Sequence, residues 1–415
     1  MTHIAIIGAG ITGVTTAYAL LERGYQVTVL DRHRYPAMET SFANGGQLSA
    51  SNAEVWNNTS TVFKGLRWMF KRDAPLLMNP SPSWHKYSWI GEFVGNIKNY
   101  RANTAQTVRL ALEARQELFR IAEKESIAFD LERRGILHIC HDRASFQSGE
   151  RVNSLLQKAG LERRAVTPQE IQKIEPTLQG KYYGGFYTPS DSTGDIHKFT
   201  RGLAAACLRK GAAFVHDVNV ENVETAGGRL SVTWASERHA EPQRTAMAFD
   251  KLVICAGVES RRLAGLLGDR VNIYPVKGYS ITANLETRES QAASPQVSLL
   301  DEAAKIVTSR LGHDRFRVAG TAEFNGFNRD IRADRIQPLT DWVRCNFPGI
   351  DTSKIVPWAG LRPMMPNMMP RVSAGRVPGV FYNTGHGHLG WTLSAATSQI
   401  VARLVDASAF ANASA

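Results

Sequence analysis

Cysteine is scarce in this sequence and forms none of the patterns typical of metal or disulfide sites. The 415 residues include four cysteines, which lie far apart without a C-x-x-C pair. This spacing excludes a zinc knuckle and a disulfide framework and favours reduced thiols, as in the cytoplasm. Long apolar runs are also missing, so no transmembrane helix is predicted. The apolar N-terminus is interrupted by glycines and follows no basic segment, which argues against a signal peptide.

Acidic residues are fewer than basic ones. The chain has 49 Lys and Arg against 38 Asp and Glu, a net charge of +11. Such a surface attracts anionic partners, either lipid or nucleic acid, or is simply solvated. No nucleic-acid-binding motif is visible, so we predict no nucleic-acid partner. The length suffices for two domains, and 43% hydrophobic residues are typical of a folded protein.

The chain opens with a pattern typical of dinucleotide binding. Gly8, Gly10 and Gly13 follow a short apolar strand as G-x-G-x-x-G and begin a helix, and the next strand ends at Asp31. The glycines permit a tight turn and close backbone approach to a pyrophosphate, which meets the helix N-terminus, while the acid reaches a ribose hydroxyl. We therefore predict a nucleotide site made of Gly8, Gly10, Ile11, Thr12, Gly13, Asp31 and Arg32.

Two features of the remaining sequence favour FAD over NAD. We predict that a buried strand at 252–257 and a glycine turn that begins a helix at 385–403 complete the nucleotide fold far from its start, so that other segments are inserted into it. The helix after the second glycine turn also offers its N-terminus to the negative charge of a reduced flavin. The predicted flavin contacts come from the small, polar loop at 36–52, from the end of the buried strand and from the glycine turn: Thr40, Ser41, Asn44, Gly45, Gly46, Gln47, Leu48, Ala256, Gly257, Gly385, Gly387, His388, Leu389, Gly390, Trp391 and Thr392.

Five segments are distinctive together: "ETSFANGGQLS" (39–49), "STGDIHKFT" (192–200), "YPVKGYSIT" (274–282), "GLRPMMP" (360–366) and "NTGHGHLGWT" (383–392). Through them the chain resembles the FAD-dependent D-amino acid dehydrogenases of the small-subunit type, within the class of D-amino acid oxidase, glycine oxidase and sarcosine oxidase. The resemblance implies an α/β fold, with a Rossmann-like FAD-binding domain (1–50, 175–260 and 355–415) and an inserted α+β substrate domain with an antiparallel sheet (51–174 and 261–354).

The implied reaction is oxidative deamination of a D-amino acid. Hydride passes from Cα to flavin N5, the imino acid hydrolyses to a 2-oxo acid and ammonia, and the electrons leave to a quinone or other respiratory acceptor. A glycine-type or sarcosine-type enzyme, or one for a cyclic imino acid such as D-proline or hydroxyproline, is the alternative. A flavin-binding subunit that needs partners to act is a third interpretation.

The predicted catalytic residues are Arg362, Tyr279, Lys305 and His386. By resemblance, Arg362 binds the substrate carboxylate through its planar fork; the alternative is a structural arginine bonded to backbone carbonyls. Tyr279 and Lys305 are expected on pocket strands, the former assisting the carboxylate contact. His386 is a candidate base or a flavin neighbour, and no metal is predicted because the H-x-H pair lacks a third ligand. No general base is required, since solvent can take the proton of the substrate amine.

Two further points concern specificity and location. Members that prefer D-alanine tend to carry Tyr-Lys where this chain has Ala304-Lys305, so the preferred side chain stays open. Residues 62–72, "VFKGLRWMFKR", combine aromatic and basic residues and suit peripheral contact with an anionic membrane on the inner face of the cell membrane. The alternative is a helix packed on the protein's own core. No cysteine falls in the flavin loops, which argues against covalent attachment.

Overall fold

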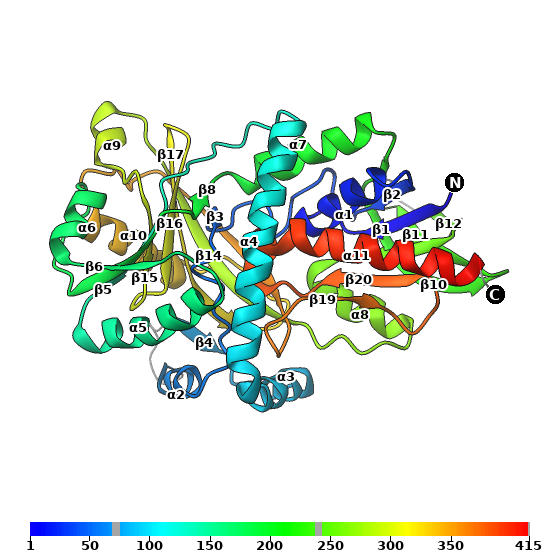
Figure 1. Cartoon of the computed structure of the whole chain (residues 1–415), viewed down its shortest axis with the longest axis horizontal. Helices are drawn as coiled ribbons and strands as arrows, with labels where there is room; N and C mark the ends of the chain where they lie inside the picture. The colour runs from blue at the N-terminus through cyan, green and yellow to red at the C-terminus, as the bar shows by residue number, and fades with distance from the viewer. Residues whose placement is uncertain (69–74, 237–242, 414–415) are drawn as a thin grey trace.

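The computed structural model describes residues 1–68, 75–236 and 243–413, and two large β-sheets organise the chain (Figure 1). The helices are α1 (Ile11–Leu21), α2 (Thr59–Trp68), α3 (Trp84–Gly95), α4 (Tyr100–Lys124), α5 (Arg143–Lys158), α6 (Pro168–Ile174), α7 (Ile196–Arg209), α8 (Ser260–Leu266), α9 (Arg288–Ala293), α10 (Ala333–Asn346) and α11 (Gly390–Ala413), with short 3-10 turns η1 (Ile97–Asn99), η2 (Gly257–Glu259) and η3 (Gly387–Leu389).

The first sheet has the order β19-β20-β13-β1-β2-β9 and is parallel except for the β19–β20 pair. Its strands are β1 (His3–Ile7), β2 (Gln26–Leu30), β9 (Ala213–Val215), β13 (Lys251–Ile254), β19 (Arg371–Ala374) and β20 (Val380–Thr384). Strands from both ends of the chain and from its middle thus pair in one sheet, and the predicted completion of the nucleotide fold by distant segments is confirmed.

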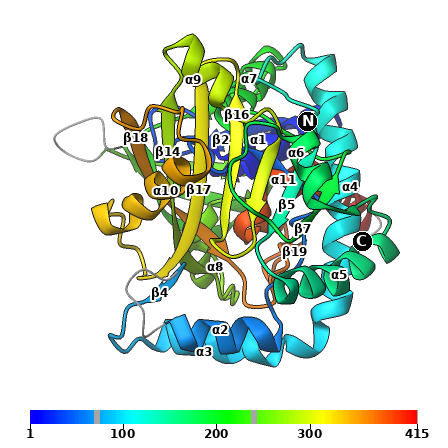
Figure 2. The ribbon, with the colours of Figure 1, turned by 90° about the vertical axis from the view of Figure 1, so that its left-hand side faces the viewer.

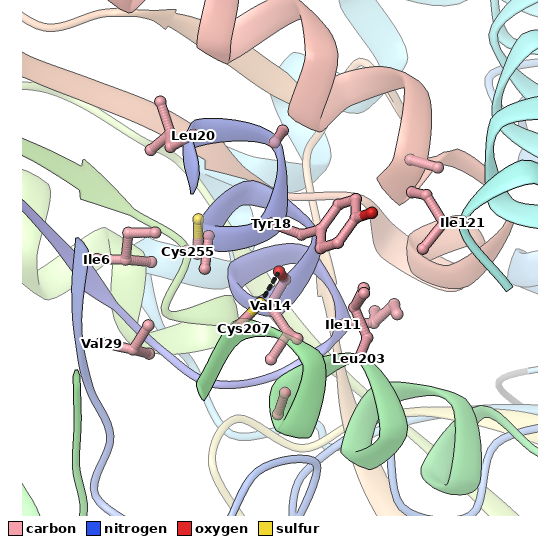
Figure 3. Packing of buried hydrophobic residues seen from close by; sticks show 14 of the residues in the cluster. Ile6, Ile11, Val14, Tyr18, Leu20, Val29, Ile121, Leu203, Cys207 and Cys255 are labelled. Atoms are coloured by element: carbon pink, nitrogen blue, oxygen red, sulfur yellow. Dashed lines mark hydrogen bonds between the residues drawn. The ribbon is translucent and has the colours of Figure 1, made fainter. Parts of the chain in front are cut away.

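Both faces of this parallel sheet are covered, as is usual for βαβ architecture. Helices α1, α4, α7 and α11 cover one face, and a three-stranded sheet of β10 (Val218–Ala226), β11 (Arg229–Ser236) and β12 (Gln243–Phe249) covers the other together with α8. Figure 3 shows how tightly α1 is enclosed: Val14 and Tyr18 pack toward α4 and α7, and the thiol of Cys207 lies 3.8 Å from the carbonyl oxygen of Val14.

The second sheet has nine strands and a mixed pattern. Its order is β18-β14-β17-β16-β15-β5-β7-β6, with β4 pairing beside β17. Its strands are β4 (Leu76–Met78), β5 (Ile136–Cys140), β6 (Arg164–Val166), β7 (Gly184–Thr188), β14 (Tyr274–Asn284), β15 (Ser298–Asp301), β16 (Ile306–Leu311), β17 (Arg315–Phe324) and β18 (Ile355–Met364). The predicted antiparallel sheet is present, but the β5–β15 and β4–β17 pairs are parallel.

Two strands pair in this second sheet although their residues were assigned to the FAD-binding domain. They are β7, within the predicted segment 175–260, and β18, at the start of the segment 355–415. The predicted domain boundaries at residues 175 and 355 therefore stay a prediction. A two-stranded ladder of β3 (Gln47–Leu48) and β8 (Ser192–Thr193) lies between the large sheets, and the long helix α4 runs across the molecule (Figure 1).

Candidate active site

A cavity of about 500 Å³ lies where the two large sheets meet. This volume is in the range of small-molecule and cofactor sites. Almost all sequence-predicted site residues line it, namely Gly8, Gly10, Ile11, Thr12, Asp31, Arg32, Thr40, Ser41, Asn44, Gly45, Gly46, Gln47, Ala256, Gly257, Tyr279, Lys305, Arg362, Gly385, His386, Gly387, His388, Leu389, Gly390, Trp391 and Thr392. Of the predicted set, Gly13 and Leu48 are not in the lining.

Each of the three glycines of the first turn is required for a different steric reason. Gly8 has φ +108°, and a Cβ there would lie 2.5 Å from the carbonyl oxygen of Cys255. A Cβ on Gly13 would lie 1.8 Å from the carbonyl oxygen of Gly8, so Gly13 serves helix–strand packing rather than ligand contact. Gly10 faces the cavity, and only the Ser41 hydroxyl, at 3.6 Å, would approach its Cβ. This leaves open space at the N-terminus of α1, where the Ile11 N–H donates to the Ser41 hydroxyl at 3.0 Å and the positive end of the helix dipole favours phosphate.

The end of β2 carries a charged cluster on the cavity wall. Both carboxylate oxygens of Asp31 accept backbone N–H groups, from Ala9 at 2.6 Å and from His33 at 2.8 Å, so Asp31 fixes the glycine turn. Its contact with a ribose stays a prediction. Sequence reasoning missed Glu39, which pairs with Arg32, His33 and Arg329. Burial opposes the charge of Glu39, but these partners lower its pKa to about 2.

Hydrogen bonds from serine side chains of the second sheet hold the backbone of the 40–48 loop in place. The hydroxyls of Ser280 and Ser309 donate to the carbonyl oxygens of Ala43 and Gly45 at 2.8 and 2.6 Å. A Cβ on Gly45 would lie 2.6 Å from Val307, so only glycine permits this close approach. Leu48, in contrast, is buried in the core and is positioned by the β3–β8 ladder.

The C-terminal glycine turn joins the two sheets. Gly385 and Gly387 have φ +76° and +58°, and the main chain between them bridges β18 through Met364 and His386. The buried His386 ring bonds the hydroxyl of Thr397 on α11 at 2.9 Å, and burial lowers its pKa to about 3. At neutral pH the ring therefore lacks the strength of a base, and the prediction of His386 as a catalytic base has no support in this geometry.

His388 occupies a different position on the cavity wall. Its ring stacks on Trp56 with centroids 4.7 Å apart, and its Nε2 lies 3.3 Å from the carbonyl oxygen of Asn52. Burial and the nearby Arg362 cation lower its pKa to about 4, so the ring is neutral. His388 is thus a neutral aromatic wall beside Arg362.

Arg362 is a guanidinium without a carboxylate partner. It lies on β18 and lines the cavity, where it lies flat against Gly278 of β14. Its Nη1 donates to the carbonyl oxygen of Thr321 at 2.9 Å, which fixes its orientation. None of the described acidic residues forms an ion pair with it, and burial lowers its pKa to about 10. A desolvated cation of this kind is stabilised by an anion supplied by a ligand.

Tyr279 lies on strand β14 at the cavity, as expected, but its hydroxyl is bonded elsewhere, and Lys305 does not lie on a strand. The hydroxyl of Tyr279 donates to Glu323 at 2.6 Å, and its ring packs in the hydrophobic cluster under α10. Tyr279 lines the cavity, but its hydroxyl proton is already donated to Glu323. The prediction that this hydroxyl assists in binding the substrate carboxylate therefore has no support in this geometry. Lys305 lies in the turn between β15 and β16, with φ +55°, rather than on a strand, and its Nζ donates to Glu302 at 2.9 Å.

Sequence reasoning also missed a polar network on the wall beside Lys305. His138 bridges Ser51 at 2.9 Å and Glu302 at 3.0 Å. Burial lowers the pKa of His138 to about 4. These residues and Arg163 come from separate elements and share no local motif, so only the tertiary structure brings them together.

Comparison with known proteins identifies the class. The family model described as DAO, FAD dependent oxidoreductase, matches residues 3–404. The chain belongs to this family, FAD is its cofactor, and the resemblance seen in the motifs is confirmed at that level. Among its relatives, a D-amino acid dehydrogenase 3 from Mesorhizobium japonicum is 62% identical over 98% of this chain and 97% of the relative. A D-amino acid dehydrogenase from Paramagnetospirillum magneticum is 40% identical over 97% of this chain and 94% of the relative.

Solved structures share the fold at low sequence identity. Glycine oxidase from Bacillus cereus matches with a TM-score of 0.74 and 20% identity, covering 98% of this chain and 95% of that one. L-proline dehydrogenase from P. horikoshii matches with a TM-score of 0.73 and 16% identity, covering 97% and 93%. The predicted fold class is confirmed by these matches.

The residues present suit FAD. The open N-terminus of α1 suits the pyrophosphate, and the close approach of the 40–48 loop at Gly45 and the turn at Gly385 leave backbone beside the cavity. None of the helices in the described part of the chain is long and apolar enough to cross a membrane. Within the same residues, no three His, Cys, Asp or Glu side chains form a group suited to a metal ion.

Proposed function

We propose that this protein oxidises D-amino acids to 2-oxo acids and ammonia and passes the electrons to a quinone or another respiratory acceptor. Bound FAD supplies the hydride acceptor for Cα–H. Arg362 carries the proposal, because a guanidinium that lines the cavity without a carboxylate partner suits a ligand with a carboxylate. The similarity to D-amino acid dehydrogenases over nearly the whole chain supports it.

The chain's own groups position the substrate rather than activate it. The Arg362 fork fixes both carboxylate oxygens, and its bond to Thr321 restricts the rotation of that fork. Neutral His388, stacked on Trp56, adds an aromatic and uncharged surface near Arg362. The amine proton passes to solvent, since neither His386 nor His388 has the pKa of a base at neutral pH.

The test is anaerobic reduction of the purified holoenzyme. Paired D- and L-amino acids, glycine, sarcosine and D-proline are mixed with it in turn, and the visible flavin band is followed. We expect bleaching by D-amino acids, with one 2-oxo acid and one ammonia formed for each flavin reduced. Bleaching by glycine, sarcosine or an imino acid alone would transfer the assignment to that substrate class. A protein that no amino acid reduces would remove the proposal. In a separate assay in air-saturated buffer, peroxide release as fast as dye reduction would contradict a respiratory acceptor.

We also propose that the protein contacts an anionic membrane on the inner face of the cell membrane through α2 and α3. These two helices lie side by side at the lower edge of the molecule in both views (Figures 1 and 2). Phe63 on α2 is 72% exposed and Trp84 on α3 is 83% exposed, as suits insertion at a lipid interface. Most of the side chains in the predicted 62–72 anchor lie outside the described residues, and Lys86 is buried, with its Nζ bonded to the carbonyl oxygens of Asn79 and Ser81.

Sedimentation with lipid vesicles tests this contact. We expect the holoenzyme to sediment with anionic phospholipid vesicles at low salt and to be released at high salt. Trp84→Ser should weaken binding, while Leu208→Ser, an exposed apolar residue on α7, should not. Equal binding by both variants, or none by the original protein, would exclude this face.

A further inference from the structure

Arg163 is a second guanidinium on the cavity wall that lacks a hydrogen-bond acceptor. It precedes β6, is 3% exposed, and lines the same cavity as Arg362. Its guanidinium carbon lies 4.6 Å from the ring centre of Phe186, a cation–π contact. Nε and Nη1 are fully buried without an acceptor, and none of its nitrogens donates to any residue in the described ranges.

The carboxylates around Arg163 are already used by other groups. Glu302 binds His138 through Oε1 and Lys305 through Oε2, and Glu54 accepts the Tyr100 hydroxyl at 2.6 Å. Burial opposes the charge of Glu302, but Lys305 and His138 hold its pKa well below the usual value. Burial raises the pKa of Glu54. Glu302, Glu54 and Asp191 all act electrostatically on Arg163. Each of these carboxylates is bonded to another group, and among the described residues none forms an ion pair with Arg163.

Arg163 and Arg362 line the same cavity, and other lining residues relate the two positions. Arg362 acts electrostatically on His388, whose ring stacks on Trp56. Trp56 lies two residues from Glu54, whose charge interacts with that of Arg163. A substrate held by its α-carboxylate at Arg362 thus shares its cavity with a second buried guanidinium, and a buried unpaired cation is costly unless a ligand pairs it.

We propose that Arg163 and Lys305 receive a carboxylate on the side chain of the substrate, so that acidic D-amino acids are preferred over apolar ones. This inference rests on the proposed function and names its substrate class. Ala304, where a tyrosine is expected in D-alanine-preferring relatives, is not part of the cavity lining and packs against the cluster under α10. The preference is therefore assigned to Arg163 and Lys305 and not to Ala304.

The experiment compares D-glutamate, its neutral isostere D-glutamine and apolar D-norvaline on the holoenzyme. We expect the highest kcat/KM for D-glutamate. Arg163→Met keeps an apolar stem over Phe186 and should lower kcat/KM for D-glutamate by about 10- to 100-fold, the loss expected for a charged hydrogen-bonded contact. The kcat/KM for D-norvaline should change by less than about threefold, because its apolar side chain makes no charged contact with Arg163 that the substitution could remove.

Two controls separate specificity from structural damage. Arg164→Met removes the neighbouring arginine, which is exposed and paired with Glu170 at 2.7 Å, and should leave all three substrates unchanged. Without substrate, Arg163→Met should not lower the Tm, because it removes an unpaired buried charge.

The outcomes also distinguish this inference from the proposed function. A higher kcat/KM for D-norvaline than for D-glutamate, or a parallel loss for all three substrates in Arg163→Met, would overturn the acidic preference and leave D-amino acid oxidation standing. If no D-amino acid reduces the flavin, the proposed function itself fails.

Discussion

The absence of a side chain at Gly278 leaves space for the Arg362 guanidinium. Replacing Gly278 therefore tests the carboxylate site while Arg362 itself is not mutated. A Cβ at position 278 would lie 2.3 Å from Nη2 and 2.4 Å from Cζ of Arg362. Since heavy atoms pack at about 3.5 Å, the guanidinium must move by about 1 Å. A displacement of that size at a positioning group costs about 100-fold in rate, or about 2.7 kcal/mol.

Gly278→Ala should therefore lower kcat/KM for D-amino acids by about 100-fold while the fold is kept. Gly278 has no positive φ, and the group that must move is the tip of a flexible side chain, so the Tm should change little. The assay is anaerobic stopped-flow flavin reduction beside thermal unfolding of the holoenzyme. Gly91→Ala on α3, where nothing lies within 4 Å of the added carbon, is the matched control and should be fully active. Unchanged kcat/KM in Gly278→Ala would refute the assignment of Arg362.

Three further predictions concern the cofactor turn and the charged cluster at β2. Gly13→Ala places a carbon against the backbone oxygen of Gly8 and should lower the Tm of the apoprotein in thermal unfolding; an unchanged Tm would contradict the packing role. Gly10→Ala meets only the Ser41 hydroxyl, so it should keep the apoprotein Tm but weaken FAD retention on gel filtration; full retention would argue against the pyrophosphate at this turn. The folded pKa of Glu39 is lowered from 4.5 to about 2, so Glu39 contributes stability that is present above pH 4.5 and is lost as the pH falls through 2. Glu39→Gln should therefore lower the free energy of unfolding by about 3 kcal/mol at neutral pH, at about 1.4 kcal/mol per unit, with the difference vanishing in acid; a pH-independent difference in denaturant titrations would contradict this.

The nucleotide half of the site could be predicted because its determinants are local. The turn from Gly8 to Gly13 and the turn from Gly385 to Gly390 each combine a strand end, glycines with required geometry and a helix N-terminus within a few residues. Such short-range constraints leave a sequence signature, and the structure brings both turns to one cavity.

The substrate half could be predicted only in part because it depends on side-chain direction and distant pairing. Arg362 was predicted from a motif and lines the cavity, while its carboxylate role stays a prediction. Tyr279 lies one residue from Gly278, and alternation along β14 turns its ring toward α10 instead of Arg362. Glu39 and Arg163 carry no local pattern that reveals their surroundings. Their roles follow from burial and from partners far along the chain, which the sequence does not display.

We propose that the substrate carboxylate binds Arg362 inside the FAD cavity. The most direct measurement is a crystal structure of the reduced holoenzyme, prepared anaerobically, with the 2-oxo acid formed from a D-amino acid. We predict both carboxylate oxygens within hydrogen-bonding distance of the Arg362 guanidinium and the carbonyl carbon facing the flavin. A carboxylate bound elsewhere, with Arg362 bonded only to the backbone oxygen of Thr321, would contradict the account.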